Sequence, residues 1–144
     1  TSIQVSGLAF REWLDINFSV TSVNTAAQTC MRFNWNDQAL YNFRLYKNRA
    51  AAVTGTSQTS ICFDNTTMSA QGYHFRISVD NSPGATKSVI WHGAENTSES
   101  NIPIIWEGIG SWSSTTQTIE MVQIFNTSSE RMATGTKLDV LGVN

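Results

Sequence analysis

Charged residues, histidines and cysteines are all scarce in this sequence. Its 144 residues include nine Lys and Arg, eleven Asp and Glu, two His and two Cys, with a net charge of −2. The basic residues are scattered, apart from a small group formed by Arg44, Lys47 and Arg49. Nucleic-acid binding requires a basic patch that follows the phosphates, so we expect no nucleic-acid partner.

Long hydrophobic runs are absent too. No apolar stretch approaches the roughly 18 residues of a membrane-spanning helix, and the first residues lack the basic start and apolar core of a targeting segment. We therefore expect a soluble chain with no membrane partner. Leu, Ile, Val and Phe still make up 33 of the 144 residues, which is enough to form a core rather than a disordered chain.

Uncharged polar residues are abundant instead. Ser, Thr and Asn make up 46 of the 144 residues, so hydroxyl and amide groups take the surface positions that charged groups occupy in most globular proteins. No change in composition and no internal repeat divides the chain, and its length suits one folding unit. The expectation is a single β-sandwich domain over residues 1–144.

Apolar and polar residues alternate along most of the chain, which is typical of strands with one buried face. The alternating segments are residues 3–5, 14–20, 31–35, 41–46, 61–63, 73–80, 89–92, 104–107, 119–125 and 138–141. Clusters of turn-forming residues separate them, including 54–57 and 80–84, and the single helical window, 50–53, is too short for more than one turn. The pattern predicts an all-β fold with about ten strands, an antiparallel two-sheet β-sandwich of jelly-roll or Greek-key type, with a barrel as the alternative.

Cys30 and Cys62 both lie in expected strand segments. Two cysteines in 144 residues do not form the dense disulfide framework of a small secreted domain. We expect two buried free thiols, and the alternative is one disulfide between neighbouring strands. Neither cysteine has a histidine or a second cysteine at metal-ligand spacing, so we expect no metal there.

The sequence shows no pattern of catalytic residues. His74 is expected on the solvent face of its strand and His92 near a strand end, and neither belongs to a nucleophile or metal motif. The loop with Glu95, Asn96 and Glu99 has too few acidic residues for a dedicated calcium site. We therefore expect neither an enzyme nor a cofactor, and a small hydrolase is the least favoured function.

Five tryptophans offer large aromatic surfaces. Trp13, Trp91 and Trp106 stand among Ile, Leu and Val, and they are expected in the core. Trp35 and Trp112 have polar neighbours, so we interpret them as exposed residues that contact a glycan or a protein partner. Core packing is the alternative for both.

Three stretches carry a resemblance to a known group of proteins. They are SGL at 6–8 with the strand expected at 14–20, RFNWND at 32–37 followed by YNFR at 41–44, and the C-terminal run at 119–126 followed by 132–142. Together they resemble the small all-β structural proteins of tailed-bacteriophage virions, of the head-decoration (cement) or tail-fibre type.

The resemblance implies a non-enzymatic structural protein located in the virion, at the capsid surface or the tail. Most concretely, it implies a decoration protein that binds the capsid surface, stabilises it and forms dimers or trimers. Its partners would be capsid or other virion proteins. The alternative is a carbohydrate-binding module or tail-fibre adhesin, which Trp35, Trp112 and the Asn-rich loops favour.

Two segments are candidates for contacts with a partner. Ile102, Ile104 and Trp106 belong to a stretch with apolar side chains on both faces, as in a strand that is covered on both sides. A core strand is the alternative there. Ile3 and Val5 alternate with polar residues near a terminus, where a strand needs another segment to pair with.

Overall fold

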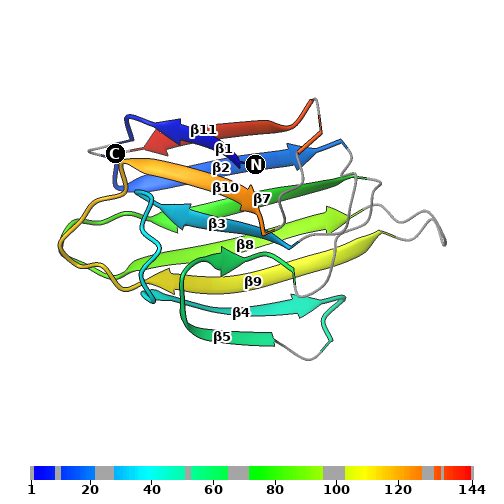
Figure 1. The fold of residues 1–144 in the computed structure, drawn as a ribbon, viewed down its shortest axis with the longest axis horizontal. Helices are drawn as coiled ribbons and strands as arrows, with labels where there is room; N and C mark the ends of the chain where they lie inside the picture. Colours follow the sequence, from blue (N-terminus) through cyan, green and yellow to red (C-terminus); the bar gives the residue numbers. More distant parts are fainter. Residues whose placement is uncertain are drawn as a thin grey trace.

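The computed structural model describes residues 2–8, 11–21, 28–50, 53–64, 72–95, 103–127, 132–133 and 135–143. These residues form eleven strands, and no helix occurs among them. All strand pairs are antiparallel, and they assemble into two sheets (Figure 1). The predicted antiparallel two-sheet β-sandwich is therefore confirmed. In the described part of the chain, no helix has the length and apolar character needed to span a membrane.

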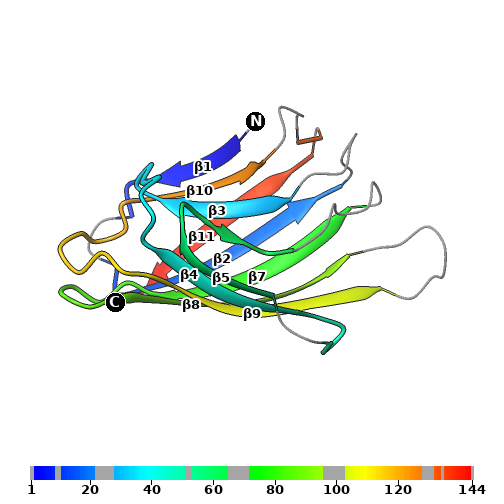
Figure 2. The same cartoon turned by 60° about the horizontal axis from the view of Figure 1, so that its bottom comes forward.

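One sheet has four strands and the other has seven. The four-stranded sheet has the order β1 (Ser2–Ser6), β10 (Met121–Asn126), β3 (Thr29–Phe33) and β6 (Ile61–Cys62). The seven-stranded sheet has the order β11 (Lys137–Val143), β2 (Trp13–Val20), β7 (Tyr73–Asp80), β8 (Lys87–Glu95), β9 (Ile104–Trp112), β4 (Tyr41–Lys47) and β5 (Val53–Gln58). Figure 2 shows the two layers, with β1, β10 and β3 lying over the longer strands of the seven-stranded sheet.

The core lies between the two sheets and follows from the period-two alternation. In β7, every second residue from Tyr73 to Val79 is buried, and His74 and the other intervening residues face solvent as predicted. Phe63 packs on both Phe75 and Trp91, with ring centroids 5.1 and 5.7 Å apart. Aromatic residues from the two sheets thus interlock and fix how the layers face each other.

The tryptophans expected in the core divide between the two sides of the seven-stranded sheet. Trp91 and Trp106 are fully buried, as predicted. The prediction for Trp13 is wrong, because its side chain is 52% exposed. Trp13 is the first residue of β2 and lies opposite Val143 of β11, on the face of the sheet that points away from the core.

The turn expected at residues 54–57 is also wrong, because these residues belong to β5. This strand pairs with β4 at an edge of the seven-stranded sheet. Gly55 makes a close approach there, since a Cβ atom on it would lie 2.5 Å from Cε1 of Phe43. An edge strand rich in Thr and Ser has little surface to bury, so it shows no apolar alternation.

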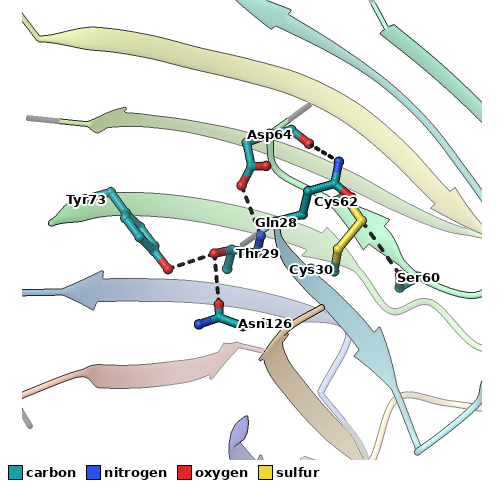
Figure 3. Close-up of a disulfide and its surroundings, with 8 residues drawn as sticks. All are labelled: Gln28, Thr29, Cys30, Ser60, Cys62, Asp64, Tyr73 and Asn126. Atoms are coloured by element: carbon teal, nitrogen blue, oxygen red, sulfur yellow. Dashed lines mark hydrogen bonds between the residues drawn. A yellow bond between two sulfur atoms is a disulfide. The ribbon is translucent and has the colours of Figure 1, made fainter. Parts of the chain in front are cut away.

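Cys30 and Cys62 form a disulfide that joins β3 to β6 (Figure 3). The expectation of two free thiols is therefore wrong, and the alternative, a disulfide between neighbouring strands, is what the structure contains. The two residues lie directly opposite each other in the antiparallel pair, so their side chains point to the same face within bonding reach. The bond secures the two-residue strand β6 to the sheet.

Candidate functional site

Trp35 is the sequence-predicted contact residue that the structure leaves accessible. Its side chain is 53% exposed, in the turn that directly follows β3. Both Asn34 and Trp35 have left-handed backbones, with φ angles of 51° and 55°. Asn tolerates this region better than most residues, whereas a bulky Trp in it is uncommon. The turn therefore holds a large aromatic side chain outward in a conformation that needs support from its surroundings.

Asn34 provides that support. Its Nδ2 donates a hydrogen bond to the carbonyl oxygen of Thr118 at 2.8 Å. Its Oδ1 accepts hydrogen bonds from the backbone N–H groups of Glu120 at 2.9 Å and Met121 at 3.0 Å. One amide side chain thus ties the end of β3 to the segment that leads into β10, which is 84 or more residues away in the sequence.

Arg32, which lies on β3 three residues before Trp35, supports the indole ring. Its guanidinium carbon lies 5.5 Å from the centre of the Trp35 ring and 4.9 Å from that of Phe125, within the range of cation–π attraction. Its Nε also donates a hydrogen bond to Oε1 of Gln123. These contacts limit the orientations of both Arg32 and Trp35, so the exposed indole is held in place before a ligand arrives.

Trp35 forms one wall of a cleft of about 600 Å³, which we call the Trp35 cleft. The residues that line it are Ser6, Gly7, Asn34, Trp35, Thr116, Gln117, Thr118, Glu120 and Met121. They combine one aromatic surface with hydroxyl, amide and carboxylate groups. Among the described lining residues, Glu120 carries the one full charge, and it is negative. The cleft is suited to a neutral ligand that offers both a flat apolar face and many hydroxyl groups.

A second accessible surface lies on the outer face of the seven-stranded sheet. Ile90, Ile105 and Ile109 are 59%, 46% and 56% exposed, and Ile90 lies directly opposite Ile109 in the β8–β9 pair. A shallow hollow of about 340 Å³ lies beside Ile90 and Ile109 and is also bordered by Tyr46 and Glu107. We call these three isoleucines the isoleucine face. Ile90 and Ile109 are directly paired, and Ile105 lies further along β9 beyond Glu107. Exposed apolar side chains on one sheet face mark sites of contact with other proteins.

A buried polar cluster lies at the other end of β3 (Figure 3). Oδ2 of Asp64 accepts a hydrogen bond from the backbone N–H of Thr29 at 3.0 Å, and the Thr29 hydroxyl donates to Oδ1 of Asn126 at 3.2 Å. Since that hydroxyl donates its proton to Asn126, the Tyr73 hydroxyl is the donor in its 2.7 Å hydrogen bond with Thr29. The cluster joins β3 to β10 and to β7 of the opposite sheet.

Burial changes the acid–base properties of this cluster. The pKa of Asp64 is raised to about 7, chiefly by burial; the hydrogen bond from Thr29 lowers it and the nearby Glu95 raises it, and both of these effects are smaller than that of burial. Burial also raises the pKa of Tyr73 to about 12. Asp64 and Thr29 are completely buried and Tyr73 is almost so. The groups are therefore not placed to touch a ligand, and they contribute to stability instead.

Trp112 and Trp106 lie in the core rather than on the surface. Trp112 is fully buried between the sheets, with its ring stacked on Tyr41 at a centroid distance of 6.2 Å. Its prediction as a contact residue is wrong, because β9 places it on the core side despite its polar neighbours. Trp106 is also fully buried, and its indole N–H donates to Oε2 of Glu95 at 2.9 Å. The prediction that Trp106 contacts a partner directly is therefore wrong too.

The other predicted partner residues are largely used within the chain. Ile3 and Val5 lie in β1, which pairs with β10, and both pack against the core. Ile104 also packs against the core, from the first position of β9. All three are half-buried, so internal packing takes up part of their apolar surface, and the contact with a partner stays a prediction for them. Ile102 lies outside the described residues.

Sequence reasoning missed the isoleucine face and most of the Trp35 cleft. Ile90 and Ile105 stand beside inward residues in apolar pairs, Val89–Ile90 and 104–105, and the second member of such a pair must point away from the core. This alternation could have identified the exposed isoleucines from the sequence. No sequence pattern could have identified Gln117 and Glu120 as cleft residues, because only folding brings residues 116–121 next to Trp35.

In the described part of the chain, no group of three or more His, Cys, Asp or Glu side chains is arranged to hold a metal ion. The loop considered for calcium is described only up to Glu95, which is buried and already accepts the Trp106 hydrogen bond. Neither a protein-family model nor a curated protein matches the sequence. The function is therefore argued from the chemistry of the Trp35 cleft and the isoleucine face.

Proposed function

We propose that the chain is a saccharide-binding β-sandwich domain and that the Trp35 cleft is its binding site. The observation that carries this proposal is the half-exposed Trp35 indole, held by Arg32 at the wall of a cleft lined with hydroxyl and amide groups. A sugar ring has an apolar face of C–H groups that packs on an aromatic ring and a rim of hydroxyl groups that both donate and accept hydrogen bonds.

The charge of the cleft points to a class of saccharide. Glu120 is exposed, and it is the one charged residue among the described residues that line the cleft. A carboxylate accepts hydrogen bonds from hydroxyl groups but repels an acidic sugar. Gln117 and the two threonines offer neutral donors and acceptors. The Arg32 guanidinium lies against the Trp35 ring but is already engaged with the Phe125 ring and with Gln123. A neutral oligosaccharide therefore fits this cleft better than one that carries carboxylate or sulfate groups.

The test is binding of the purified protein to an array of neutral and acidic oligosaccharides, followed by calorimetric titration of the strongest neutral binder. We expect Trp35→Ala to weaken binding about tenfold or more, because the loss of one aromatic contact of this kind costs roughly 1–2 kcal/mol. Trp13→Ala is the matched control, since Trp13 is equally exposed but lies on the other sheet. An array without any bound saccharide, or equal binding by the Trp35 variant, contradicts the proposal.

A second candidate function is that of a virion decoration protein, which the resemblance to phage structural proteins favours. The supporting observation is the isoleucine face, because three exposed isoleucines on two adjacent strands give a rigid apolar surface for another protein subunit. In this proposal, the domain docks on a capsid or tail subunit through the outer face of the seven-stranded sheet.

This second candidate predicts stoichiometric sedimentation of the protein with purified tailed-phage particles that lack it. Ile109→Asp should abolish the co-sedimentation, because it buries a charge in the contact, while Trp35→Ala should leave it unchanged. Particles that bind neither form of the protein, or bind the Ile109 variant equally well, would exclude this role.

A further inference from the structure

We propose that two copies of this chain form a dimer by packing face to face through the outer surface of the seven-stranded sheet. The contact is centred on the isoleucine face and covers β7, β8, β9 and β4. The inference goes beyond saccharide binding, and it places a second copy of the chain on the surface that a virion subunit would take in the second candidate function. It rests on the side chains that lie in each row across these strands and on the area of the face.

The two central strands present three neighbouring rows of outward side chains. Each row has one member on β8 and one on β9, and the pairs are Ile90–Ile109, His92–Glu107 and Ala94–Ile105. All six side chains alternate with residues that point to the core, so they share the outer face. The row of His92 and Glu107 thus lies between two apolar rows.

A two-fold axis that runs along the strands between β8 and β9 makes these rows complementary to themselves. In a face-to-face pair, this axis sets β8 of each copy over β9 of the other without changing the row. Ile90 of one copy then meets Ile109 of the other, and Ala94 meets Ile105. Each contact occurs twice, as two-fold symmetry requires. The strands of the two copies run in similar directions, which is the aligned type of sheet packing.

The charged row fits the same axis. It places His92 of one copy over Glu107 of the other, where an imidazole N–H can donate to the carboxylate. Glu107 is the one acidic side chain among the outward residues of β8 and β9, so the pairing prevents its burial without a partner. An axis perpendicular to the strands through this row would instead set Glu107 against its own copy, which the like charges disfavour.

The arginines of this face are compatible with the contact. Arg76 of β7 lies in the row of His92, and Tyr46 of β4 lies in that of Glu107. The axis therefore brings Arg76 over the Tyr46 ring of the second copy, where a cation–π contact can form. Arg76 is also ion-paired with Asp15 of its own chain at 2.8 Å. Arg44 is exposed at the margin of the contact, and its long stem lets the charge reach water.

The shape of the face also suits an opposing sheet. The hollow beside Ile90 and Ile109 gives an isoleucine of the second copy a place to enter. The next row beyond these isoleucines holds Ser88 and Ser111, whose side chains are short. Two sheets packed face to face lie about 10 Å apart with interdigitating side chains, and this face has the relief for such packing.

The area of the face is sufficient for a stable dimer. The four strands have seven to nine residues each. With strands about 4.8 Å apart and a rise of about 3.4 Å per residue, they cover roughly 20 Å by 30 Å. Two copies therefore bury on the order of 1,200 Å², which is the lower end of specific interfaces. We expect a dissociation constant on the order of 10 µM.

The dimer leaves saccharide binding possible in both copies. None of the residues that line the Trp35 cleft belongs to the seven-stranded sheet, so the contact does not cover the cleft. Two clefts in one particle bind a multivalent glycan surface more tightly than one cleft does. Pairing of the sheets would thus strengthen binding to a surface without changing the cleft itself.

Sedimentation velocity of the full chain from about 1 µM to about 300 µM tests the pairing, because a dimer of this strength forms progressively over that range. Ile109→Asp should weaken the dimer about 100-fold, since the contact would bury the introduced charge twice. Leu141→Asp is the matched control. Leu141 is exposed on the outer face of the same sheet, but it belongs to β11, which lies beyond β2 and outside the contact.

Charge changes at the central row test the axis. His92→Glu should weaken the dimer about tenfold, because each introduced carboxylate faces Glu107 of the other copy. Glu107→Lys should weaken it as well, because it removes the acceptor for His92 and sets an ammonium against the imidazole. An equimolar mixture of the two variants should recover dimer, since the introduced Glu of one chain then faces the introduced Lys of the other.

Each outcome decides the proposal. Loss of dimer in Ile109→Asp but not in Leu141→Asp, with recovery in the mixture of the two charge variants, supports it. A chain that is monomeric up to about 300 µM overturns it. A dimer that persists in Ile109→Asp, or that is lost equally in Leu141→Asp, overturns it too. Absence of recovery in the mixture overturns the two-fold arrangement. Circular dichroism verifies the fold of each variant.

Discussion

The two ends of β3 are held in place by different kinds of side chain. At its first residue, Thr29, the strand is joined to the buried carboxyl of Asp64 and to Tyr73 and Asn126. After its last residue, Phe33, the neutral amide of Asn34 makes three hydrogen bonds to backbone groups. The first end is closed to ligands, whereas the second presents Trp35 to solvent.

The two ends of β3 therefore respond differently to pH. The Asn34 amide has all of its hydrogen bonds directed at uncharged backbone groups, so it holds Trp35 at any ordinary pH. At the other end, Oδ1 of Asp64 and Nδ2 of Asn126 are buried, and neither has a hydrogen-bond partner among the described residues. A buried carboxyl with an unsatisfied oxygen disfavours its own ionisation. Stability at that end therefore depends on pH.

The largest expected effect concerns Asp64. Its pKa is about 7 in the folded protein against 3.8 for the ordinary side chain, so between these values the folded state binds more protons than the unfolded state. Its contribution to the free energy of unfolding is fully present below about pH 4, falls as pH rises and is lost above about pH 7, a total of about 4 kcal/mol.

Asp64→Asn tests this directly, because Asn keeps an oxygen that accepts the Thr29 hydrogen bond. The variant should be more stable than the unmodified protein at pH 8, and the difference should shrink towards pH 4. Urea unfolding at a series of pH values measures both effects. Identical pH dependence in the two proteins would contradict the raised pKa of Asp64.

The next effect concerns the disulfide, which also lies near the first end of β3. The bond joins two residues 32 positions apart, and removing a cross-link that closes a loop of that size costs about 4 kcal/mol in the chain-entropy description. We expect Cys30→Ala with Cys62→Ala to lower the free energy of unfolding by this amount, as measured by urea unfolding. The reductant tris(2-carboxyethyl)phosphine should destabilise the unmodified protein and leave the double variant unchanged; equal effects on both would contradict this account.

A smaller effect is expected at the second end of β3. Asn34→Ala removes three hydrogen bonds and places Ala in the left-handed region, for a loss of about 2 kcal/mol in stability. Asn34→Gly removes the same bonds but tolerates the positive φ, so it should lose less. Both variants should also weaken saccharide binding, because Trp35 loses its support. Normal stability in Asn34→Ala would show that this end of β3 is held by other contacts.

The strands were predictable to the extent that they have one buried face. β2, β7 and β8 alternate clearly because each of them packs on the core along its full length. β5 was not predictable from alternation, since its residues Thr54, Thr56 and Ser57 lie at an exposed edge. Period-two patterns report burial rather than strand geometry, and a strand without a buried face leaves no such pattern.

The tryptophans show that the exposure of candidate site residues is also hard to predict from their sequence neighbours. Trp35 and Trp112 both have polar neighbours in the sequence, yet one is 53% exposed and the other is fully buried. Trp112 ends β9 on the side that faces Tyr41 and Phe33, which come from elsewhere in the chain. Local polarity cannot distinguish these cases, because the side to which a terminal strand residue points depends on strand pairing.

The sequence by itself determined that the chain forms an antiparallel β-sandwich with a surface rich in hydroxyl and amide groups. These properties follow from local alternation and composition, which each segment carries independently of the others. Only the tertiary structure decided that Cys30 is bonded to Cys62, that residues 116–121 complete a cleft around Trp35 and that β11 is a free edge. Each of these depends on which distant segments become neighbours, and that is set by packing between the sheets.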